Sequence, residues 1–438
     1  MDPIANAAKA GQSKHTKLNR QQIIGFWAAW SGWTLDGLAS FSYALVLAPA
    51  LTELLPKSGI RATPGNIGLA GSILFALFLV GWGLSFLWGP LADRFGRTKT
   101  LAGTILVYAL FTAAAAFSQT VWQLAIFRLL AGIGIGGEWS LAGTYVAEAW
   151  PEDRRKMGAG YLQTGYYFGF FIAAALNYTI GAHYGWRAIF LCNLPPVVLA
   201  LLIMSYVHEP ERWQKTAADE HAHHVKPRPL RDIFNASYRK KTIVNTGLLT
   251  VAIIGLWAGS VYEPTAVIDI AKRLGKSAAE GTRLSSIATA LLSIGTVIGC
   301  LAAPLLCEWW GRRKTLAFYF AGMGVCIFFT FGMAFYWATN GLDAFIAGLF
   351  VLGFFGGNFA IFTLWLPEQY DTSVRATAFA FSTSFGRFLG AGANFAVGAM
   401  VHSMGTIGTP VAYTAIAFGL GILLVPFATE TRGQTLPG

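Results

Sequence analysis

The chain has 438 residues, of which 55% are apolar and only 12% are charged, about half the charged share of a typical soluble domain. Its mean hydropathy of +0.51 excludes a disordered protein, and a water-soluble fold could not cover so much apolar side chain. The net charge of +11 would suit a nucleic-acid partner, but the composition as a whole predicts an integral membrane protein.

A transmembrane helix needs about 20 mostly apolar residues, and twelve stretches of the chain meet this requirement. A polar stretch at 209–241 separates a bundle of six predicted helices at 24–208 from a second bundle of six at 242–438, which ends in a short tail. Residues 1–23 form a polar N-terminal tail. The predicted spans are 24–52, 67–88, 101–118, 121–147, 157–182, 187–207, 242–268, 284–306, 315–337, 342–366, 376–401 and 409–428.

The distribution of basic residues predicts the orientation of these spans. With the N-terminus in the cytoplasm, the tails and loops on that side hold 23 Lys and Arg residues, against 7 on the opposite side. Cytoplasmic loops of membrane proteins carry such an excess. We therefore expect a multi-pass protein of the cytoplasmic (inner) membrane with both termini and the central loop inside, and no nucleic-acid partner.

The second half of the chain repeats features of the first. The segment GPLADRFGRTK at 89–99 returns about 215 residues later as LCEWWGRRK at 306–314. At an offset of 220, Glu148 matches Glu368, and Gly-Gly-Glu138 matches Gly-Gly-Asn358. Many transporters form a cavity at the membrane midplane from two such repeats. The sequence therefore predicts an all-α membrane protein of twelve helices in two pseudo-symmetric bundles.

The segment at 89–99 resembles the signature loop of the major facilitator superfamily, and the similarity to that superfamily covers essentially the whole chain. More narrowly, several segments resemble the sialate and lactate proton symporters and, more distantly, the aromatic-acid symporters. The resemblance implies a secondary transporter that couples to the proton gradient. One departure is Ala39, where those relatives commonly carry a second aspartate three residues after the one matched by Asp36. The segments are 18–21, 33–37, 128–139, 144–151 and 185–187.

Charged residues at the cytoplasmic ends of the spans predict a gate. Glu148 lies within reach of Arg94 or Arg97, and its counterpart Glu368 lies within reach of Arg312 or Arg313. Such pairs could close the cytoplasmic mouth and break when it opens, although loop charges also serve simply to anchor the topology. The predicted gate comprises Asp93, Arg94, Arg97, Glu148, Glu308, Arg312, Glu368 and Arg375.

Ionisable side chains inside spans are expensive and therefore indicate function. Asp36 lies about half-way along the first span, and Glu138 lies near the middle of the fourth. A carboxyl group in a poorly solvated site can carry a proton, whereas the alternative is a permanent ion pair with Arg128 or Arg387. The predicted proton-coupling residues are Asp36, Glu138 and Arg128, and Arg128 could instead be structural.

Arg387, about half-way along the eleventh span, is the main candidate for substrate binding. A guanidinium keeps its charge when buried and holds a carboxylate through two parallel hydrogen bonds. Polar residues at helical spacing on other spans could line the same wet cavity, although polar side chains also join helices in membranes. With Arg387, the predicted site comprises Asn358, Thr383, Asn394, Gln163, Tyr167, Trp365 and Tyr262.

The sequence has no phosphate-binding loop and no catalytic or metal-binding motif, so we expect neither an enzyme nor a cofactor. We predict a monomeric secondary transporter that moves a small organic carboxylate across the lipid bilayer by alternating access, driven by proton symport. Lactate is the favoured substrate, with sialate or an aromatic acid as further candidates. The alternative is a carrier of the same fold for a neutral sugar or a drug-like solute.

Overall fold

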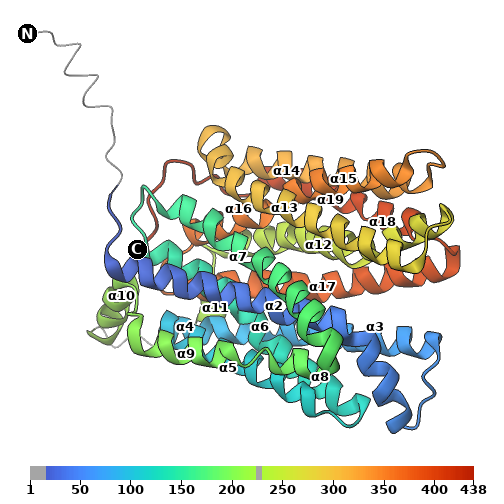
Figure 1. The fold of residues 1–438 in the computed structure, drawn as a ribbon. Helices are drawn as coiled ribbons and strands as arrows, with labels where there is room; N and C mark the ends of the chain where they lie inside the picture. Colours follow the sequence, from blue (N-terminus) through green and yellow to red (C-terminus); the bar gives the residue numbers. More distant parts are fainter. Residues whose placement is uncertain (1–15, 223–228) are drawn as a thin grey trace, which may run out of the picture.

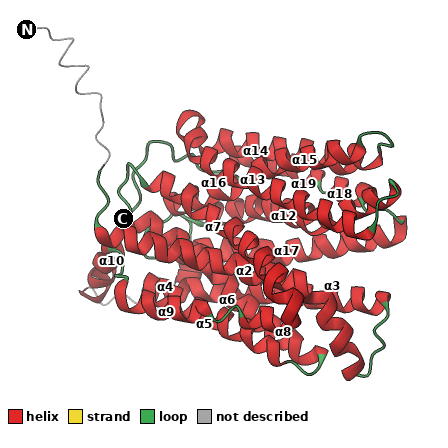
Figure 2. Ribbon diagram, in the orientation of Figure 1, coloured by secondary structure: helices red, strands yellow, loops and turns green. Residues whose placement is uncertain are grey.

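The computed structural model describes residues 16–222 and 229–438, which form long, roughly parallel helices without any strand (Figures 1 and 2). Figure 1 shows the two halves of the chain as two groups of helices, with α7 and α17 along their boundary. Thr16 and the C-terminal segment lie at the same end of the molecule, which we call the terminal end. We call the other end of the molecule the opposite end.

Helices cover each of the twelve predicted spans, although the sixth, at 187–207, is interrupted at 192–194. The first half contains α2 (Arg20–Lys57), α3 (Pro64–Leu84), η1 (Ser85–Leu87), α4 (Trp88–Phe95), α5 (Arg97–Ala114), η2 (Ala115–Phe117), α6 (Val121–Ala149), α7 (Arg155–Leu176), η3 (Asn177–Gly181), α8 (Ala182–Leu191) and α9 (Pro195–Tyr206). The second half contains α12 (Arg239–Arg273), α13 (Ala278–Trp310), α14 (Arg312–Ile327), η4 (Phe328–Met333), η5 (Ala334–Tyr336), α15 (Gly341–Gly356), α16 (Asn358–Trp365), η6 (Pro367–Gln369), α17 (Arg375–Met404), α18 (Gly408–Tyr413), α19 (Ala415–Leu424) and η7 (Val425–Phe427).

Within the described residues, eight helical segments are long and apolar enough to cross a bilayer, and α2 makes a ninth if its two parts count as one span. Those two parts meet at a 64° bend before Pro49, where the proline ring removes a helical hydrogen bond. The long helices α7, α12 and α17 fall outside this count. Of these three, α7 packs against α13 and α16 of the second half, and α17 packs against α3, α4 and α6 of the first.

The repeated loop motif has a direct structural basis in two glycines. Gly96 separates α4 from α5 with φ +112°, and Gly311 separates α13 from α14 with φ +86°. Residues with a side chain rarely adopt such backbone angles, so glycine allows the sharp connection at both places. The duplication seen in the sequence is therefore a duplication of backbone geometry.

The central polar segment holds two further helices, α10 (Glu211–Ala222) and α11 (Pro229–Asp232). Trp213 of α10 donates its indole N–H to the carbonyl of Asp93 at 2.9 Å. Arg212 donates to the Glu152 carboxylate at 2.7 Å. Helix α10 is thus docked on the terminal end of the first half.

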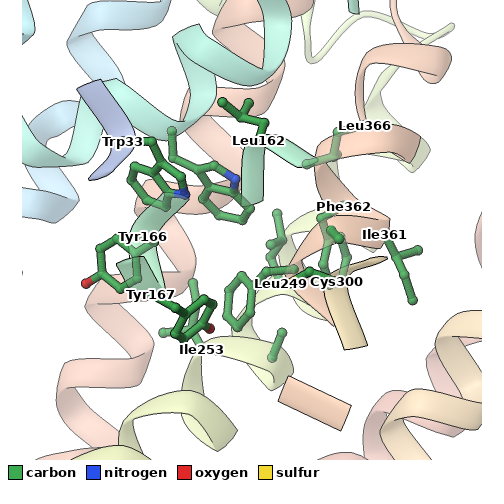
Figure 3. Packing of buried hydrophobic residues seen from close by; sticks show 14 of the residues in the cluster. Trp33, Leu162, Tyr166, Tyr167, Leu249, Ile253, Cys300, Ile361, Phe362 and Leu366 are labelled. Atoms are coloured by element: carbon green, nitrogen blue, oxygen red, sulfur yellow. The ribbon is translucent and has the colours of Figure 1, made fainter. Parts of the chain in front are cut away.

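Side chains of both halves meet in a common core. Figure 3 shows Trp33, Tyr166 and Tyr167 of the first half near Ile253 and Phe362 of the second. All five are buried. The two bundles are therefore packed against one another around the middle of the molecule.

Candidate functional site

Three buried ionisable side chains lie deep within the helices. Asp36 of α2 and Glu138 of α6 are fully buried, and Arg387 of α17 is 4% exposed. Glu138 is eleven residues from the last residue of α6, and Arg387 is twelve residues from the first residue of α17, so at 1.5 Å per residue they lie about 17 and 18 Å from the terminal end. The structure thus brings all three to the interior, as the sequence predicts.

Arg387 joins the two halves through aromatic rings instead of an ion pair. Its guanidinium carbon lies 4.1 Å from the ring centre of Trp82 and 5.7 Å from that of Trp139, both in the first half. Its Nη1 is buried without a hydrogen-bond partner among the described residues. Such cation–π contacts leave the N–H groups free to bind an anion.

Asp36 is close enough to Glu138 and Arg387 to interact with both electrostatically, yet neither of its carboxylate oxygens has a hydrogen-bond partner in the described part of the chain. No ion pair within 4 Å joins Arg387 to either acid in that part. An unpaired buried charge is costly. Asp36 thus lies in the interior without a polar partner in that part of the chain.

Glu138 occupies a recess made by a glycine of the neighbouring helix. A Cβ atom on Gly32 of α2 would lie 2.3 Å from Glu138 Oε1, so a larger residue there would force the carboxylate to move. The Thr104 hydroxyl of α5 lies 3.4 Å from the other carboxylate oxygen, a weak contact. Glu138 is thus held between α2, α5 and α6.

A polar bridge crosses the boundary beside this group. The indole N–H of Trp139 donates to the Thr363 hydroxyl of α16 at 2.9 Å. That hydroxyl shares its single proton between the carbonyl of Phe359 at 3.0 Å and Gln163 of α7 at 3.2 Å. Trp139 also stacks on Trp33, with ring centres 6.1 Å apart. The predicted residue Gln163 therefore lies in the site, together with Thr363, which was not predicted.

The other predicted substrate residues of the second half are more dispersed. Thr383 is buried, and its hydroxyl donates to the carbonyl of Ala380. Asn358 is buried with its Oδ1 unpartnered among the described residues, and so is Oδ1 of Asn394. Trp365 donates its indole N–H to the carbonyl of Thr429, near the C-terminus.

Two predicted tyrosines lie on different helices. Tyr167 is buried beside Tyr166, with ring centres 5.8 Å apart. The half-buried Tyr262 of α12 faces Gly398 of α17, eleven residues beyond Arg387. At 1.5 Å per residue this is about 16 Å along the helix, so the structure does not bring Tyr262 beside Arg387.

Arg128 forms a separate buried site. Its guanidinium carbon lies 3.7 Å from the ring centre of Tyr43 and 4.4 Å from that of Phe78. All three guanidinium nitrogens lack hydrogen-bond partners in the described residues. The alternative of a permanent Arg128–Glu138 ion pair is therefore not realised among the described residues.

At the terminal end, ion pairs join the two halves. Arg97 binds the Glu148 carboxylate through two contacts of 3.1 Å and Asp93 at 2.9 Å, within the first half. Arg375 of the second half lies 2.7 Å from the same Glu148. Asp93 accepts a hydrogen bond from the backbone N–H of Thr377 at 2.9 Å. All four charged side chains are fully buried.

A second network mirrors the first. Arg312 binds Glu368 at 2.9 Å and Glu308 at 2.9 Å, within the second half. Arg155 of the first half lies 3.1 Å from Glu368, and Lys156 lies 2.8 Å from Glu308. Neither Arg155 nor Lys156 was predicted from the sequence.

The arginine–glutamate pairs that join the halves are equivalent in the two networks, because exchanging each residue for its counterpart in the other half converts one pair into the other. We call the two networks exchange-related. Arg155 and Arg375 are 220 residues apart, as are Glu148 and Glu368. Each arginine binds the acid of the other half. The offset that relates the two acids in the sequence would therefore have identified Arg155.

Arg94 lies apart from these networks. It is exposed, its guanidinium carbon lies 5.2 Å from the ring centre of Phe95, and it forms no ion pair with any described residue. Of the two arginines that could reach Glu148, the structure selects Arg97. Among the described residues, Arg94 therefore takes no part in the ion pairs that join the halves.

Two further acids, also not predicted, hold the repeated glycine turns. The Glu209 carboxylate accepts the backbone N–H groups of Arg97 and Thr98 at the start of α5. Glu430 does the same for Arg312 and Arg313 at the start of α14. Carboxylates stabilise helix N-termini in this way.

The C-terminal segment lies across the boundary between the halves. The backbone N–H of Leu436 donates to Glu152 at 3.2 Å, and the carbonyl of Pro437 accepts from Arg375 at 2.7 Å. Partial burial acts to raise the pKa of Glu152, but the Arg155 guanidinium, with further donors, outweighs it and holds that pKa below its ordinary value. The segment therefore adds polar contacts to the closed terminal end.

Ion pairs at the opposite end stay within one half. Glu53 binds Arg187 at 2.6 Å, both in the first half, and Asp269 lies 3.4 Å from Arg273 on the same helix. Among the described residues, the ion pairs that join the halves are therefore at the terminal end. The structure is therefore held closed at the terminal end.

Two pseudo-symmetric helical bundles, joined by ion pairs at one end and enclosing unpaired charges between them, define a membrane transporter. The family model of the Major Facilitator Superfamily matches residues 29–393, and the chain belongs to this superfamily. It is a transporter family, so the chain is not an enzyme.

Curated relatives and solved structures are similar to this chain over most of its length. A protein of Cupriavidus pinatubonensis described as a probable 4-methylmuconolactone transporter is 28% identical over 94% of this chain and 92% of its own length. The cis,cis-muconate transport protein of Acinetobacter baylyi is 28% identical over 86% of this chain and 88% of its own. The proton:xylose symporter XylE has the same fold, with a TM-score of 0.77, 19% identity and coverage of 95% and 97% of the two chains.

Proposed function

We propose that this transporter moves a small organic carboxylate by alternating access, coupled to proton symport. The observation that carries the proposal is the buried Nη1 of Arg387 at the boundary between the halves, which has no hydrogen-bond partner among the described residues. A carboxylate would satisfy this group and its neighbours through paired hydrogen bonds. The muconate transport protein supports an organic acid as the class of substrate, and a monocarboxylate such as lactate remains the favoured candidate, ahead of sialate or an aromatic acid.

Proton coupling in this proposal rests on Asp36 and Glu138. The substrate anion would neutralise Arg387, and a proton on one of the two acids would offset the remaining charge, since an ion is costly to move through a low-dielectric passage. Both acids lie on the first half, whereas Arg387 lies on the second. Movement of one half relative to the other would therefore change the distance between the proton site and the anion site.

In the same proposal the terminal end faces the cytoplasm of a bacterial-type inner membrane, as the excess of basic residues on that side indicates. The two exchange-related networks, Glu148–Arg375 and Arg155–Glu368, hold the cytoplasmic mouth closed. Inward opening requires both to break. The protein works as a monomer with this single passage.

Uptake into proteoliposomes tests the substrate class and the coupling together. Labelled lactate, sialate, cis,cis-muconate and a neutral sugar are offered with and without an inward proton gradient. We expect gradient-driven accumulation of a carboxylate, abolished in Asp36→Asn or Glu138→Gln and retained in Arg94→Gln, whose arginine is exposed and unpaired among the described residues. Uptake of the sugar alone would establish the alternative carrier of a neutral solute, and accumulation unaffected by the gradient would exclude symport.

A further inference from the structure

A basic pocket lined only by residues of the second half lies at the terminal end. Its volume is about 440 Å³, and it is bounded by the end of α13, the start of α14, η7 and the C-terminal segment. Three of its residues are basic and one is acidic. Its lining is Trp310, Gly311, Arg313, Lys314, Ala317, Val425, Glu430 and Arg432.

The single acid of the pocket is already engaged. Glu430 accepts hydrogen bonds from the backbone N–H groups of Arg312, Arg313 and Arg432 at 3.0 to 3.1 Å. One N–H of the Arg313 side chain donates to the carbonyl of Pro426 at 2.8 Å, which leaves the other donors of that guanidinium. Lys314 and Arg432 are exposed. The pocket therefore presents donors and positive charge.

The surface around the pocket is apolar. Trp309 is 72% exposed and Phe427 is 58% exposed, and Phe318 and Leu423 are exposed as well. These side chains lie on segments that end at the same level as the basic residues, where tryptophan is typical of the boundary between lipid and water. A ligand with an anionic head and apolar chains would match both parts of this surface.

The basic lining is not a by-product of the internal duplication. At the offset of 215 that relates the two loops, Arg313 corresponds to Thr98 and Lys314 to Lys99. At the offset of 221 that relates Glu430 to Glu209, Arg432 corresponds to Glu211. The helix-capping acid is thus repeated, whereas two of the three basic side chains belong to the second half alone.

We propose that this pocket binds the anionic headgroup of a membrane phospholipid, with the acyl chains on the apolar surface of α13, α14 and η7. Basic pockets between transmembrane helices bind such headgroups, and each Lys or Arg near the membrane surface contributes about five-fold in affinity. The proposal does not depend on the transported solute.

Native mass spectrometry of the full chain in detergent tests the proposal, with phosphatidylglycerol and phosphatidylcholine as the probes. We expect wild type to retain phosphatidylglycerol in preference to phosphatidylcholine. The double variant Arg313→Gln/Arg432→Gln should lower the affinity for phosphatidylglycerol about 25-fold, from about five-fold for each charge. The matched control is Lys99→Gln, which removes the charge at the equivalent place in the first half and should leave the affinity unchanged.

Three results would overturn the proposal. They are an unchanged affinity in the double variant, an equal loss in Lys99→Gln, and displacement of the lipid by inorganic phosphate at equal concentration, which would make the site one for free phosphate. If the double variant does not give folded protein, the single variant Lys314→Gln replaces it, because the Lys314 side chain is exposed and its loss should not disturb folding. The expected loss is then about five-fold.

Discussion

Replacing Glu148 by glutamine is expected to open the terminal end. The Glu148 carboxylate is fully buried between Arg97 of its own half and Arg375 of the other. The contact with Arg97 persists when the halves separate, so only the 2.7 Å contact with Arg375 favours the closed state. Removing one partner of a buried ion pair costs about 3–5 kcal/mol. The lower value, about 3 kcal/mol, shifts the closed-to-open equilibrium a little over 100-fold.

A thiol-labelling assay measures this shift. Ser384 of the second half lies 3.0 Å from Ser85 of the first between their hydroxyl oxygens, and both are buried. A cysteine at position 384, in a background whose four native cysteines are replaced by serine, should react with a maleimide only when the halves separate.

We expect Glu148→Gln to raise the labelling rate of that cysteine strongly, and Arg155→Gln to raise it by a similar factor, since the two networks are exchange-related. Arg94→Gln is the control and should not change the rate. An unchanged rate in Glu148→Gln, in protein that still unfolds at the wild-type temperature, would refute the gating role of these pairs.

Two further predictions concern the polar bridge and the terminal end. Thr363→Val should lower the free energy of unfolding by about 1–3 kcal/mol, because it leaves the buried Trp139 N–H without its acceptor, while Thr363→Ser should restore most of it. Equal stability of all three proteins in thermal unfolding would contradict the bridge. Because the folded-state pKa of Glu152 is held below its ordinary value, its stabilising contribution is present above the unfolded-state pKa and is lost as the pH falls through the lowered one. Glu152→Gln should therefore unfold with less dependence on pH in that acidic range, and an unaltered pH profile would contradict the ion pair with Arg155.

The positions of the helices could be predicted from the sequence because the lipid bilayer imposes a simple requirement. About 20 apolar residues are needed for each span, and each of the twelve stretches that met it is helical. The helix ends were harder to predict. Helix α2 begins at Arg20, four residues before the predicted span, because Asn19 and Gln22 cap it through reciprocal hydrogen bonds.

The candidate site could be predicted only in part. Buried charges are unusual in apolar spans, so Asp36, Glu138 and Arg387 were conspicuous, and the structure places all three in the interior. Thr363 was not, because threonine is common in such spans and its importance depends on a contact with Trp139, 224 residues away.

The glycine turn explains the choice between two neighbouring arginines, because Arg94 lies on α4 before Gly96 and Arg97 begins α5 after it. Asp93 and Arg97 are four residues apart across the glycine turn and form a pair at 2.9 Å. Arg94 follows Asp93 directly and is exposed on another face. The spacing within the loop motif alone did not distinguish them, since both could reach Glu148 along the chain.

The most direct test of a carboxylate carrier is equilibrium binding to Arg387 variants of the purified protein. A labelled carboxylate that wild type accumulates is titrated against wild type, Arg387→Ala, Arg387→Lys and the control Arg94→Gln, beside its neutral amide analogue. We expect Arg387→Ala to lose carboxylate binding, Arg387→Lys to keep a weakened part of it, and Arg94→Gln to match wild type, while the amide binds none of them well. Wild-type affinity of Arg387→Ala for the carboxylate would contradict the account.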